Sequence, residues 1–319
     1  MNIVASLLAA ASVATATPAA SPIEAAGPAG PLKGTLLMPA SKPKATIVII
    51  PGSGPTDRDG NNPMGVSGGT YRLLAEGLAA DGIATVRIDK RGMFASAAAI
   101  PNANDVTIAD YAADAHRWAK AARAATGAPC VWLLGHSEGG LVAMAAAQDP
   151  ADICGLVLIA APGRKLADVI REQLRANPAN APILDQALSA LDSLEAGRRV
   201  DTGAMNPALL PLFGPQVQGF LISLFSYDPA RLVGAVAKPV LIVQGERDLQ
   251  VSVADAHRLA AADPKARLVL VPTANHVLKA VASDDRSANL ATYGNPDLPL
   301  APGIVDAIAA FVAGPLASR

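Results

Sequence analysis

The chain has 319 residues and a formal net charge of −1, and 51% of its residues are hydrophobic although only 3% are aromatic. A nucleic-acid-binding protein ordinarily presents a basic face, so this charge balance argues against a nucleic-acid partner. Beyond the N-terminus no apolar stretch reaches the roughly 18 residues that span a bilayer, and we expect no stable membrane insertion. The length fits one large α/β domain or two small ones, and the oligomeric state stays open.

The first residues differ from the rest of the chain. Residues 3–16 are apolar or small throughout, and 14–16 or 18–20 offers a small-residue cleavage site. This pattern predicts a secretory signal peptide over residues 1–20, followed by a domain over 21–319. The positively charged start of such a signal is missing, so a disordered Ala-rich tail or a mis-assigned start is the alternative. With a signal peptide, the protein would be periplasmic or secreted.

Strand and helix patterns alternate along most of the remaining chain. An early strand over 32–38, which we expect to be antiparallel, precedes a series of buried strand patterns. These strand patterns cover 45–50, 83–88, 131–134, 155–159, 239–243 and 266–271, and the helical patterns cover 71–81, 108–125, 140–147, 253–262 and 303–313. Strands that alternate with helices predict a parallel sheet with helices on both faces.

One stretch, residues 164–236, breaks this alternation. It contains helical segments at 166–175 and 183–194 and a Pro-rich piece at 205–215, but no strand pattern. We predict a helical cap inserted over the carboxyl edge of the sheet. A disordered linker is the alternative, but the regular leucine and isoleucine content argues against it.

Two cysteines open neighbouring strand patterns. Cys130 precedes the strand at 131–134, and Cys154 precedes the strand at 155–159. If these strands pair, both sulfur atoms lie at the same edge of the sheet, where an oxidising compartment would permit a disulfide. Two buried free thiols are the alternative, and this is the reading we favour.

The pentapeptide Gly135-His136-Ser137-Glu138-Gly139 lies between a strand pattern and a helix pattern. This order is typical of a nucleophile elbow, the sharp turn that holds a serine nucleophile. The glycines allow a strained serine backbone and close packing around it. The sequence therefore predicts that Ser137 is a catalytic nucleophile.

A serine nucleophile needs a histidine base and a carboxylate that orients it. His276 follows the last strand pattern and Asp248 follows the strand at 239–243, and parallel sheets place catalytic groups at such carboxyl ends. We predict these two residues as partners of Ser137, in the chain order serine–acid–histidine. Glu246 is the alternative acid. The remaining histidines are expected to lie on the surface or, for the one before Ser137, to support the turn: His116, His257 and His136.

The tetrahedral intermediate of acyl transfer needs backbone N–H donors for its oxyanion. We predict the amide of Glu138, the residue after the nucleophile, as one donor. The second is expected from the loop at 51–55, and we assign it to the Ser53 amide, with Gly54 as the alternative. Glycines in this loop let the backbone approach the substrate closely.

Neither a metal nor a cofactor is expected. The segment at 57–61 partly matches a calcium loop, but Asn62 and Gly68 occupy positions where the EF-hand pattern requires glycine and glutamate. The sequence has no zinc-type spacing of histidine and cysteine and no phosphate-binding loop. A charged cluster after the next strand is expected to pair with Asp57 or Asp59 rather than bind an anion, and it comprises Arg87, Asp89, Lys90 and Arg91.

Together these motifs resemble the α/β-hydrolase superfamily from about Leu32 onward. Three segments are similar to bacterial esterases grouped with serine-aminopeptidase-like and cinnamoyl-esterase-like hydrolases: PGSGPTDRDG at 51–60, DKRG at 89–92 and GHSEGG at 135–140. Such esterases usually carry Arg-Gly-x-Gly-x-Ser, whereas here Phe94 replaces the second glycine. The resemblance therefore does not predict the shape of that loop. The resemblance implies an eight-stranded, mostly parallel sheet, no cofactor, a triad of Ser137, Asp248 and His276, and an oxyanion hole formed by Ser53 and Glu138.

We therefore expect a serine esterase that cleaves small-molecule esters with small to medium acyl groups through an acyl-enzyme intermediate. A serine aminopeptidase or amidase is the first alternative, and it would need an acidic pocket for a substrate amine, for which Glu138 or Asp228 could serve. A non-catalytic hydrolase fold used as a binding module is the second. The complete serine–acid–histidine set argues against that module.

Overall fold

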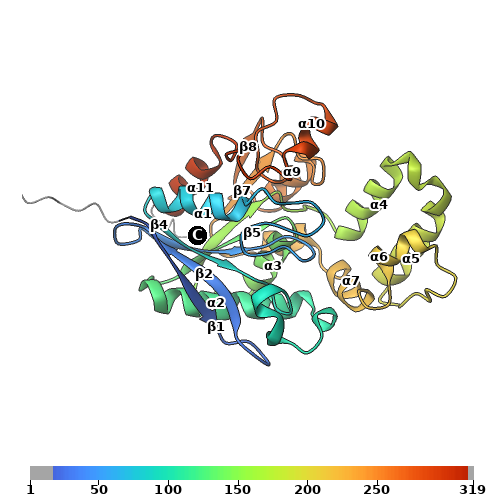
Figure 1. Cartoon of the computed structure of the whole chain (residues 1–319), viewed down its shortest axis with the longest axis horizontal. Helices are drawn as coiled ribbons and strands as arrows, with labels where there is room; N and C mark the ends of the chain where they lie inside the picture. The colour runs from blue at the N-terminus through green and yellow to red at the C-terminus, as the bar shows by residue number, and fades with distance from the viewer. Residues whose placement is uncertain (1–16, 315–319) are drawn as a thin grey trace, which may run out of the picture.

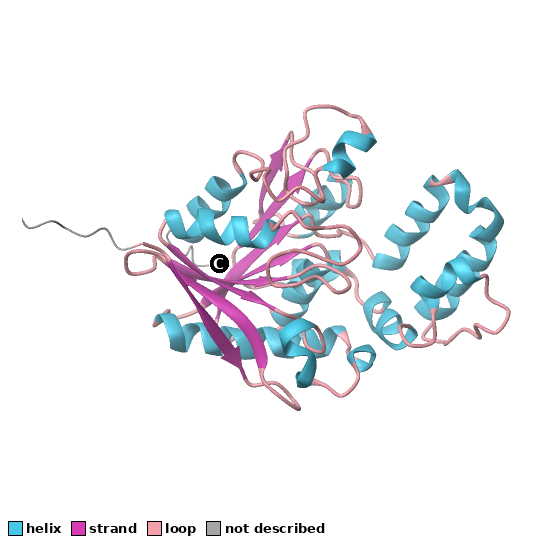
Figure 2. Ribbon diagram, viewed as in Figure 1, coloured by secondary structure: helices cyan, strands magenta, loops and turns pink. Residues whose placement is uncertain are grey.

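An eight-stranded sheet forms the centre of this computed structural model, which describes residues 17–314 (Figures 1 and 2). The strand order is β1-β2-β4-β3-β5-β6-β7-β8; the pairs β1–β2 and β2–β4 are antiparallel, and every other pair is parallel. The mostly parallel sheet with an antiparallel early strand is thus confirmed. The strands are β1 (Ala19–Ala25), β2 (Leu32–Met38), β3 (Ala45–Ile50), β4 (Ile83–Ile88), β5 (Val131–His136), β6 (Ile153–Ile159), β7 (Val240–Gly245) and β8 (Arg267–Val271).

Helices cover both faces of the sheet because successive strand residues point to opposite sides. Within β3, Ile47 and Ile49 belong to one hydrophobic core, whereas Val48 and Ile50 belong to the other. The first core lies under α1 (Thr70–Ala80) and α11 (Ile304–Val312), and the second under α2 (Ile108–Thr126), α3 (Glu138–Ala146) and α9 (Val253–Ala262). Three shorter elements lie in loops: η1 (Phe94–Ala99), η2 (Ala103–Asp105) and α10 (Arg286–Ala291).

Local sequence fixes the two ends of α2. The Thr107 hydroxyl accepts from the Asp110 N–H, and the Asp110 carboxylate accepts from the Thr107 N–H. This capping box satisfies two N–H groups that the first helical turn would otherwise leave free. At the other end Gly127 has a φ of 71°, the left-handed conformation that ends many helices. The chain then enters β5 four residues later.

The segment between β6 and β7 is helical and lies beyond the carboxyl edge of the sheet, to the right in Figure 1. Its α7 is tied to the core at α2, where the rings of Phe220 and Tyr111 pack edge-to-face and Ser223 Oγ accepts from the Ile108 N–H at 3.1 Å. The segment comprises α4 (Leu166–Ala176), η3 (Pro178–Ile183), α5 (Leu184–Glu195), η4 (Pro207–Leu209), α6 (Leu210–Phe213), α7 (Gln218–Phe225) and α8 (Pro229–Ala235).

No single helix within residues 17–314 has the length and apolar character needed to cross a membrane. The segments Pro207–Phe213 and Gln218–Phe225 meet that test only when they are counted together, and they are bent by 60° relative to each other.

The strand β1 was not predicted from the sequence. It pairs along its whole length with β2 at the edge of the sheet, and most of its residues are exposed. An exposed edge strand carries no buried apolar run, which is the signal that identifies the other strands. The signal-peptide prediction concerns residues 1–20, of which 1–16 lie outside the described residues. Cleavage after Ala16 would leave β1 complete, whereas cleavage after Ala20 would remove its first two residues.

The favoured prediction of two free thiols is wrong. Cys130 and Cys154 form a disulfide, with their Cα atoms 5.2 Å apart. The parallel pairing of β5 with β6 places Val131 opposite Ile153, so the residues at the start of both strands meet. The disulfide lies at the amino edge of the sheet, opposite the edge where the candidate site is found.

Candidate active site

Ser137 occupies a strained turn between β5 and α3. Its φ is 54° and its ψ is −123°, a combination that a residue with a side chain rarely adopts. The flanking glycines allow the turn to pack. A Cβ atom on Gly135 would lie 2.2 Å from the Gly139 carbonyl oxygen, and one on Gly139 would lie 2.3 Å from the Ile50 carbonyl oxygen. The glycines predicted to permit an elbow are therefore required by close backbone contacts.

Asp248 and His276 are joined at the carboxyl edge of the sheet. His276 Nδ1 donates to Asp248 Oδ2 at 2.8 Å, and the two side chains are 7% and 1% exposed. The other carboxylate oxygen of Asp248 accepts from the N–H groups of Gln250 and Val251 at 2.7 and 2.9 Å. These bonds leave Nε2 of His276 free to accept a proton. The alternative acid, Glu246, is exposed and makes no bond to His276.

Burial by itself would raise the pKa of Asp248. The positive charge of His276 and the hydrogen bonds from His276, Val251 and Gln250 outweigh burial, so the pKa of this carboxyl lies below its ordinary value. Asp248 is therefore ionised at neutral pH, as a residue that stabilises an imidazolium must be.

Ser137 and His276 line one cavity of about 180 Å³. Within residues 17–314 no hydrogen bond joins the Ser137 hydroxyl to the His276 ring, so the structure brings the two groups to one cavity without linking them. The other lining residues are mostly apolar or carry neutral polar groups, and among them are Ser53, Thr56, Met64, Val66, Val277 and Tyr293.

The predicted oxyanion donors lie on the two segments that meet beside Ser137. A Cβ atom on Gly52 would lie 3.3 Å from the Ser137 Cβ, so the loop after β3 passes directly against the elbow. Ser53 lines the cavity, whereas Gly54 does not, and this favours Ser53 over Gly54 as the donor. Glu138 is not among the residues that line the cavity, and its buried side chain points to Lys90, so the prediction for this residue concerns only its backbone N–H.

His136, the residue before Ser137, connects three loops of the site. The Gly52 N–H donates to the Tyr71 hydroxyl oxygen at 3.0 Å, and this hydroxyl lies 2.8 Å from His136 Nδ1. Nε2 of the same ring lies 2.8 Å from the His276 carbonyl oxygen. Because a carbonyl can only accept, Nε2 carries the proton and Nδ1 accepts from Tyr71. Burial lowers the pKa of His136 to about 3, with a further contribution from His276. The His136 ring supports the turn, as predicted. The sequence did not indicate that its partners are the Tyr71 hydroxyl and the His276 carbonyl oxygen.

The charged cluster after β4 was only partly predicted. Arg87 pairs with Asp59, as expected. Asp57 instead accepts from the N–H groups of Asp59 and Asn61, both at 2.8 Å, and so stabilises its own turn. The other pairs were not foreseen, and they are Arg58 with Asp89, Arg91 with Asp110 and Asp114, and Lys90 with Glu138.

Phe94, which replaces a glycine of the esterase motif, has a φ of 45°. This lies in the left-handed region that favours glycine. The loop therefore takes up a backbone conformation suited to glycine, although a side chain is present, and Phe94 is 45% exposed.

Residues 47–291 match the sequence model of the Alpha/beta hydrolase family, and the fold agrees with that match. The chain belongs to this family.

Two further comparisons extend this family assignment. The chain is 27% identical over 232 residues to Esterase EstD of Thermotoga maritima, a match that covers 70% of this chain and 52% of that protein. It therefore spans about half the length of this curated relative. Among solved structures, Est1E from Butyrivibrio proteoclasticus has a TM-score of 0.55 at 19% identity, over 91% of this chain and 96% of Est1E. The esterase domain of a Rhodothermus marinus protein has a TM-score of 0.53 at 16% identity, over 93% and 100%. At these identities the two structures establish a shared fold.

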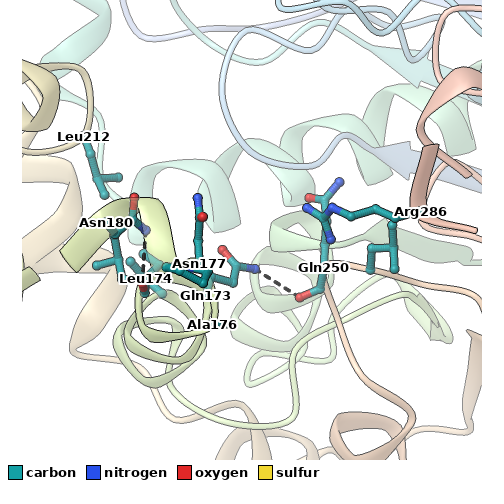
Figure 3. Close-up of a pocket in the computed structure, with 11 residues that line it drawn as sticks. Gln173, Leu174, Ala176, Asn177, Asn180, Leu212, Gln250 and Arg286 are labelled. Atoms are coloured by element: carbon teal, nitrogen blue, oxygen red, sulfur yellow. Dashed lines mark hydrogen bonds between the residues drawn. The ribbon is translucent and has the colours of Figure 1, made fainter.

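In this α/β-hydrolase a second, larger cleft of about 750 Å³ lies between the helical segment after β6 and the loops that follow β7 and β8 (Figure 3). Gln250 lines both this cleft and the Ser137 cavity. Gln173 of α4 donates to the Gln250 carbonyl oxygen at 3.1 Å and so ties the cap to the loop that carries Asp248. Arg286 is the one ionisable residue in the described lining, and its side chain extends toward Gln250 (Figure 3).

Within residues 17–314 no group of three or more histidine, cysteine, aspartate or glutamate side chains could hold a metal ion. The predictions that the protein needs neither a metal nor a cofactor stay predictions.

Proposed function

We propose that this chain is a serine hydrolase of carboxylic esters, with Ser137 as nucleophile, His276 as base and Asp248 as its orienting acid. The observation that carries the proposal is the 2.8 Å bond between buried Asp248 and His276, next to the cavity that Ser137 lines on its strained turn. Two printed names support the same class, because EstD and the Rhodothermus domain are both called esterases.

The chemistry follows from the hydrogen bonds of the pair. Nε2 of His276 takes the proton of the Ser137 hydroxyl while its oxygen attacks the ester carbonyl carbon. The carbonyl oxygen, now negative, accepts from the backbone N–H groups of Ser53 and Glu138. The carbon–oxygen bond to the alcohol then breaks, and His276 returns the proton to the leaving alkoxide. Water repeats these steps on the acyl-enzyme, releases the acid and restores Ser137.

The surroundings of Ser137 favour an ester over the amine-bearing substrate of an aminopeptidase. Such a substrate needs a free carboxylate for its amino group, but the described lining of the cavity contains none. The two acids that the sequence offered as partners for a substrate amine already bind other groups of the protein. Glu138 is buried against Lys90, and the Asp228 carboxylate accepts from the first N–H groups of α8. The Ser137 cavity suits a small to medium acyl group. The cleft of about 750 Å³, which shares Gln250 with this cavity, has room for the alcohol part of the ester.

Replacing Ser137 with alanine tests the proposal. We expect the wild-type protein to hydrolyse a short nitrophenyl ester faster than an aminoacyl nitroanilide, and to be labelled by a fluorophosphonate. The Ser137→Ala variant should fold with an unchanged circular dichroism spectrum and lose both properties. Ester turnover that survives in this variant would contradict the mechanism, and a wild-type protein without turnover would favour the binding-module alternative.

The disulfide supports a location outside the cytoplasm, because disulfides form and persist in oxidising compartments. We propose a periplasmic or secreted protein with a cleaved signal peptide. Fractionation of expressing cells, with mass spectrometry of the mature N-terminus, tests both statements. Intact protein in the cytoplasmic fraction would contradict them.

A further inference from the structure

One buried lysine joins the two segments from which the oxyanion donors are proposed to come. Lys90 Nζ donates to the Gly52 carbonyl oxygen at 2.6 Å. Its second partner is the Glu138 carboxylate, 3.5 Å away, and both side chains are 3% exposed. Gly52 precedes Ser53 in the loop after β3, and Glu138 directly follows Ser137. The ammonium group therefore bridges the backbone of one donor segment and the side chain of the other.

The surroundings of Lys90 hold this group in place. Its Nζ lies 5.4 Å from the centre of the Tyr111 ring, an arrangement in which an ammonium is attracted to an aromatic face. The cavity beside it has a volume of only about 10 Å³, near the lower limit for a single water molecule. Burial lowers the pKa of Lys90, and the Glu138 carboxylate opposes that shift. Lys90 is thus fixed by protein groups rather than by solvent.

The bond to Gly52 acts on the donor through the peptide plane. The Gly52 carbonyl and the Ser53 N–H belong to one peptide unit, which is planar and trans. In such a unit the C=O and N–H groups point in opposite directions. A lysine that fixes the Gly52 oxygen on the buried side therefore aims the Ser53 N–H away from itself, and Ser53 lines the Ser137 cavity. Rotation of this peptide would break the bond to Lys90.

The ion pair has a second consequence for the site. Glu138 places a carboxylate next to the segment that stabilises a developing negative charge, and like charges repel strongly where water is excluded. The ammonium of Lys90 balances this carboxylate at 3.5 Å. The site therefore keeps the backbone donor of Glu138 without the unfavourable field of its side chain.

We propose that Lys90 is a positioning residue of the oxyanion hole, which fixes the Ser53 amide through Gly52 and neutralises Glu138. This role rests on the proposed ester hydrolysis. Lys90 is buried and is not among the described residues that line the Ser137 cavity, so its effect should fall on the transition state rather than on substrate binding.

The informative variant removes both charges of the ion pair. Lys90→Met alone would leave a buried carboxylate without a cation, which destabilises a fold strongly. Lys90→Met combined with Glu138→Gln avoids this. Glu138→Gln alone is the reference, because a buried lysine that loses its carboxylate partner can release its proton and still donate an N–H to the Gly52 carbonyl oxygen. Relative to that reference, kcat for a nitrophenyl ester should fall roughly 10- to 100-fold, because a displacement of about 1 Å in a catalytic group costs about 100-fold. KM should change less than about 2-fold.

A trifluoromethyl ketone, which forms a tetrahedral oxyanion adduct with an active serine, should bind the double variant more weakly by the same factor as kcat falls. The matched control is Lys44→Met, because Lys44 Nζ also donates to a backbone carbonyl, that of Asp81 at 2.9 Å, but on the surface. We expect Lys44→Met to keep wild-type turnover and inhibitor affinity.

A readout independent of activity completes the test. Amide hydrogen exchange of residues 51–60, followed by mass spectrometry, should be faster in the double variant than in Glu138→Gln. Equal exchange, equal kcat and equal inhibitor affinity in these two proteins would overturn the role of Lys90. If the wild-type protein hydrolyses no ester, the proposed function is wrong, while the exchange rates still decide whether Lys90 orders the loop.

Discussion

Two neighbouring strands, β5 and β6, are each followed by a residue with a similar positive φ but different chemistry. Ser137 after β5 has a φ of 54°, and Ala160 after β6 has a φ of 49°. The N–H of each donates to a carbonyl of the next strand, Ser137 to Ile159 at 2.9 Å and Ala160 to Val243 at 3.0 Å. A strained residue at a strand end is therefore a feature of this sheet and does not by itself identify a nucleophile.

The side chains around each turn make the difference. His136 precedes Ser137 and bonds to Tyr71 and to the backbone of His276, whereas its register partner Ile159 is apolar and buried. The chain after β5 enters α3 at once, whereas the chain after β6 continues toward the cap. A strained turn becomes a candidate site only where the adjoining loops bring a base and backbone donors to the same cavity.

The largest expected effect concerns Asp248, the proposed acid of the site at the end of β5; the turn after β6 has no such partner in this proposal. Asp248→Asn should lower kcat for a nitrophenyl ester by about 10³- to 10⁴-fold, because asparagine cannot hold the imidazole in the required tautomer. Steady-state kinetics measure this loss. Glu246→Gln, at the exposed alternative acid on the same loop, should keep wild-type turnover. Similar losses in the two variants would contradict the assignment.

The opposite ends of both strands are joined by the disulfide, and its loss should destabilise them together. Cys130→Ser combined with Cys154→Ser opens a link between residues 24 positions apart, which should cost about 3 kcal/mol in the free energy of unfolding. Urea unfolding measures this change, and ester turnover of the folded variant at 25 °C should persist. A stability equal to that of the oxidised wild-type protein would show that the disulfide does not anchor these strands.

His136 should make the free energy of unfolding depend on pH. Its register partner Ile159 has no titratable group and cannot have this effect. The pKa of His136 is about 3 in the folded protein and about 6.5 in an unfolded chain. Between these values the unfolded state binds a proton that the folded state does not, so the free energy of unfolding falls as pH falls. The slope is about 1.4 kcal/mol for each pH unit. Urea unfolding at pH 6, 5 and 4 should give a slope steeper by this amount for the wild-type protein than for His136→Gln, and parallel slopes would refute the prediction.

The smallest expected effect compares the two strained residues directly. Glycine adopts a positive φ without the steric cost of about 1 to 2 kcal/mol, but it loses roughly 0.5 to 1 kcal/mol more in chain entropy. In thermal unfolding, Ser137→Gly and Ala160→Gly should therefore each change the stability of the fold by between 0 and about +1.5 kcal/mol. Only Ser137→Gly should abolish ester turnover. A loss of turnover in both variants would mean that the β6 turn also shapes the site.

Most of the sheet could be predicted from the sequence because most of its strands are buried apolar runs. The run 45–50 matches β3 residue for residue, and the helix at 253–262 matches α9. The edge strand β1 was missed because exposed residues leave no such pattern. The order of Ser137, Asp248 and His276 along the chain was enough to propose them together, since parallel strands deliver their carboxyl ends to one edge.

The sequence by itself determined the order of the buried strands and of the helices that cover them, the glycine-flanked turn at Ser137 and the residues proposed for acyl-transfer chemistry. These follow from local patterns of burial, backbone freedom and chain order. Only the tertiary structure decided which charges pair and which sulfur atoms bond. Lys90 was expected near Asp57 or Asp59 but lies against Gly52 and Glu138, and Cys130 meets Cys154 through the pairing of two strands. Hydrogen bonds and ion pairs act over a few ångströms, so their partners depend on how distant segments pack and not on their spacing along the chain.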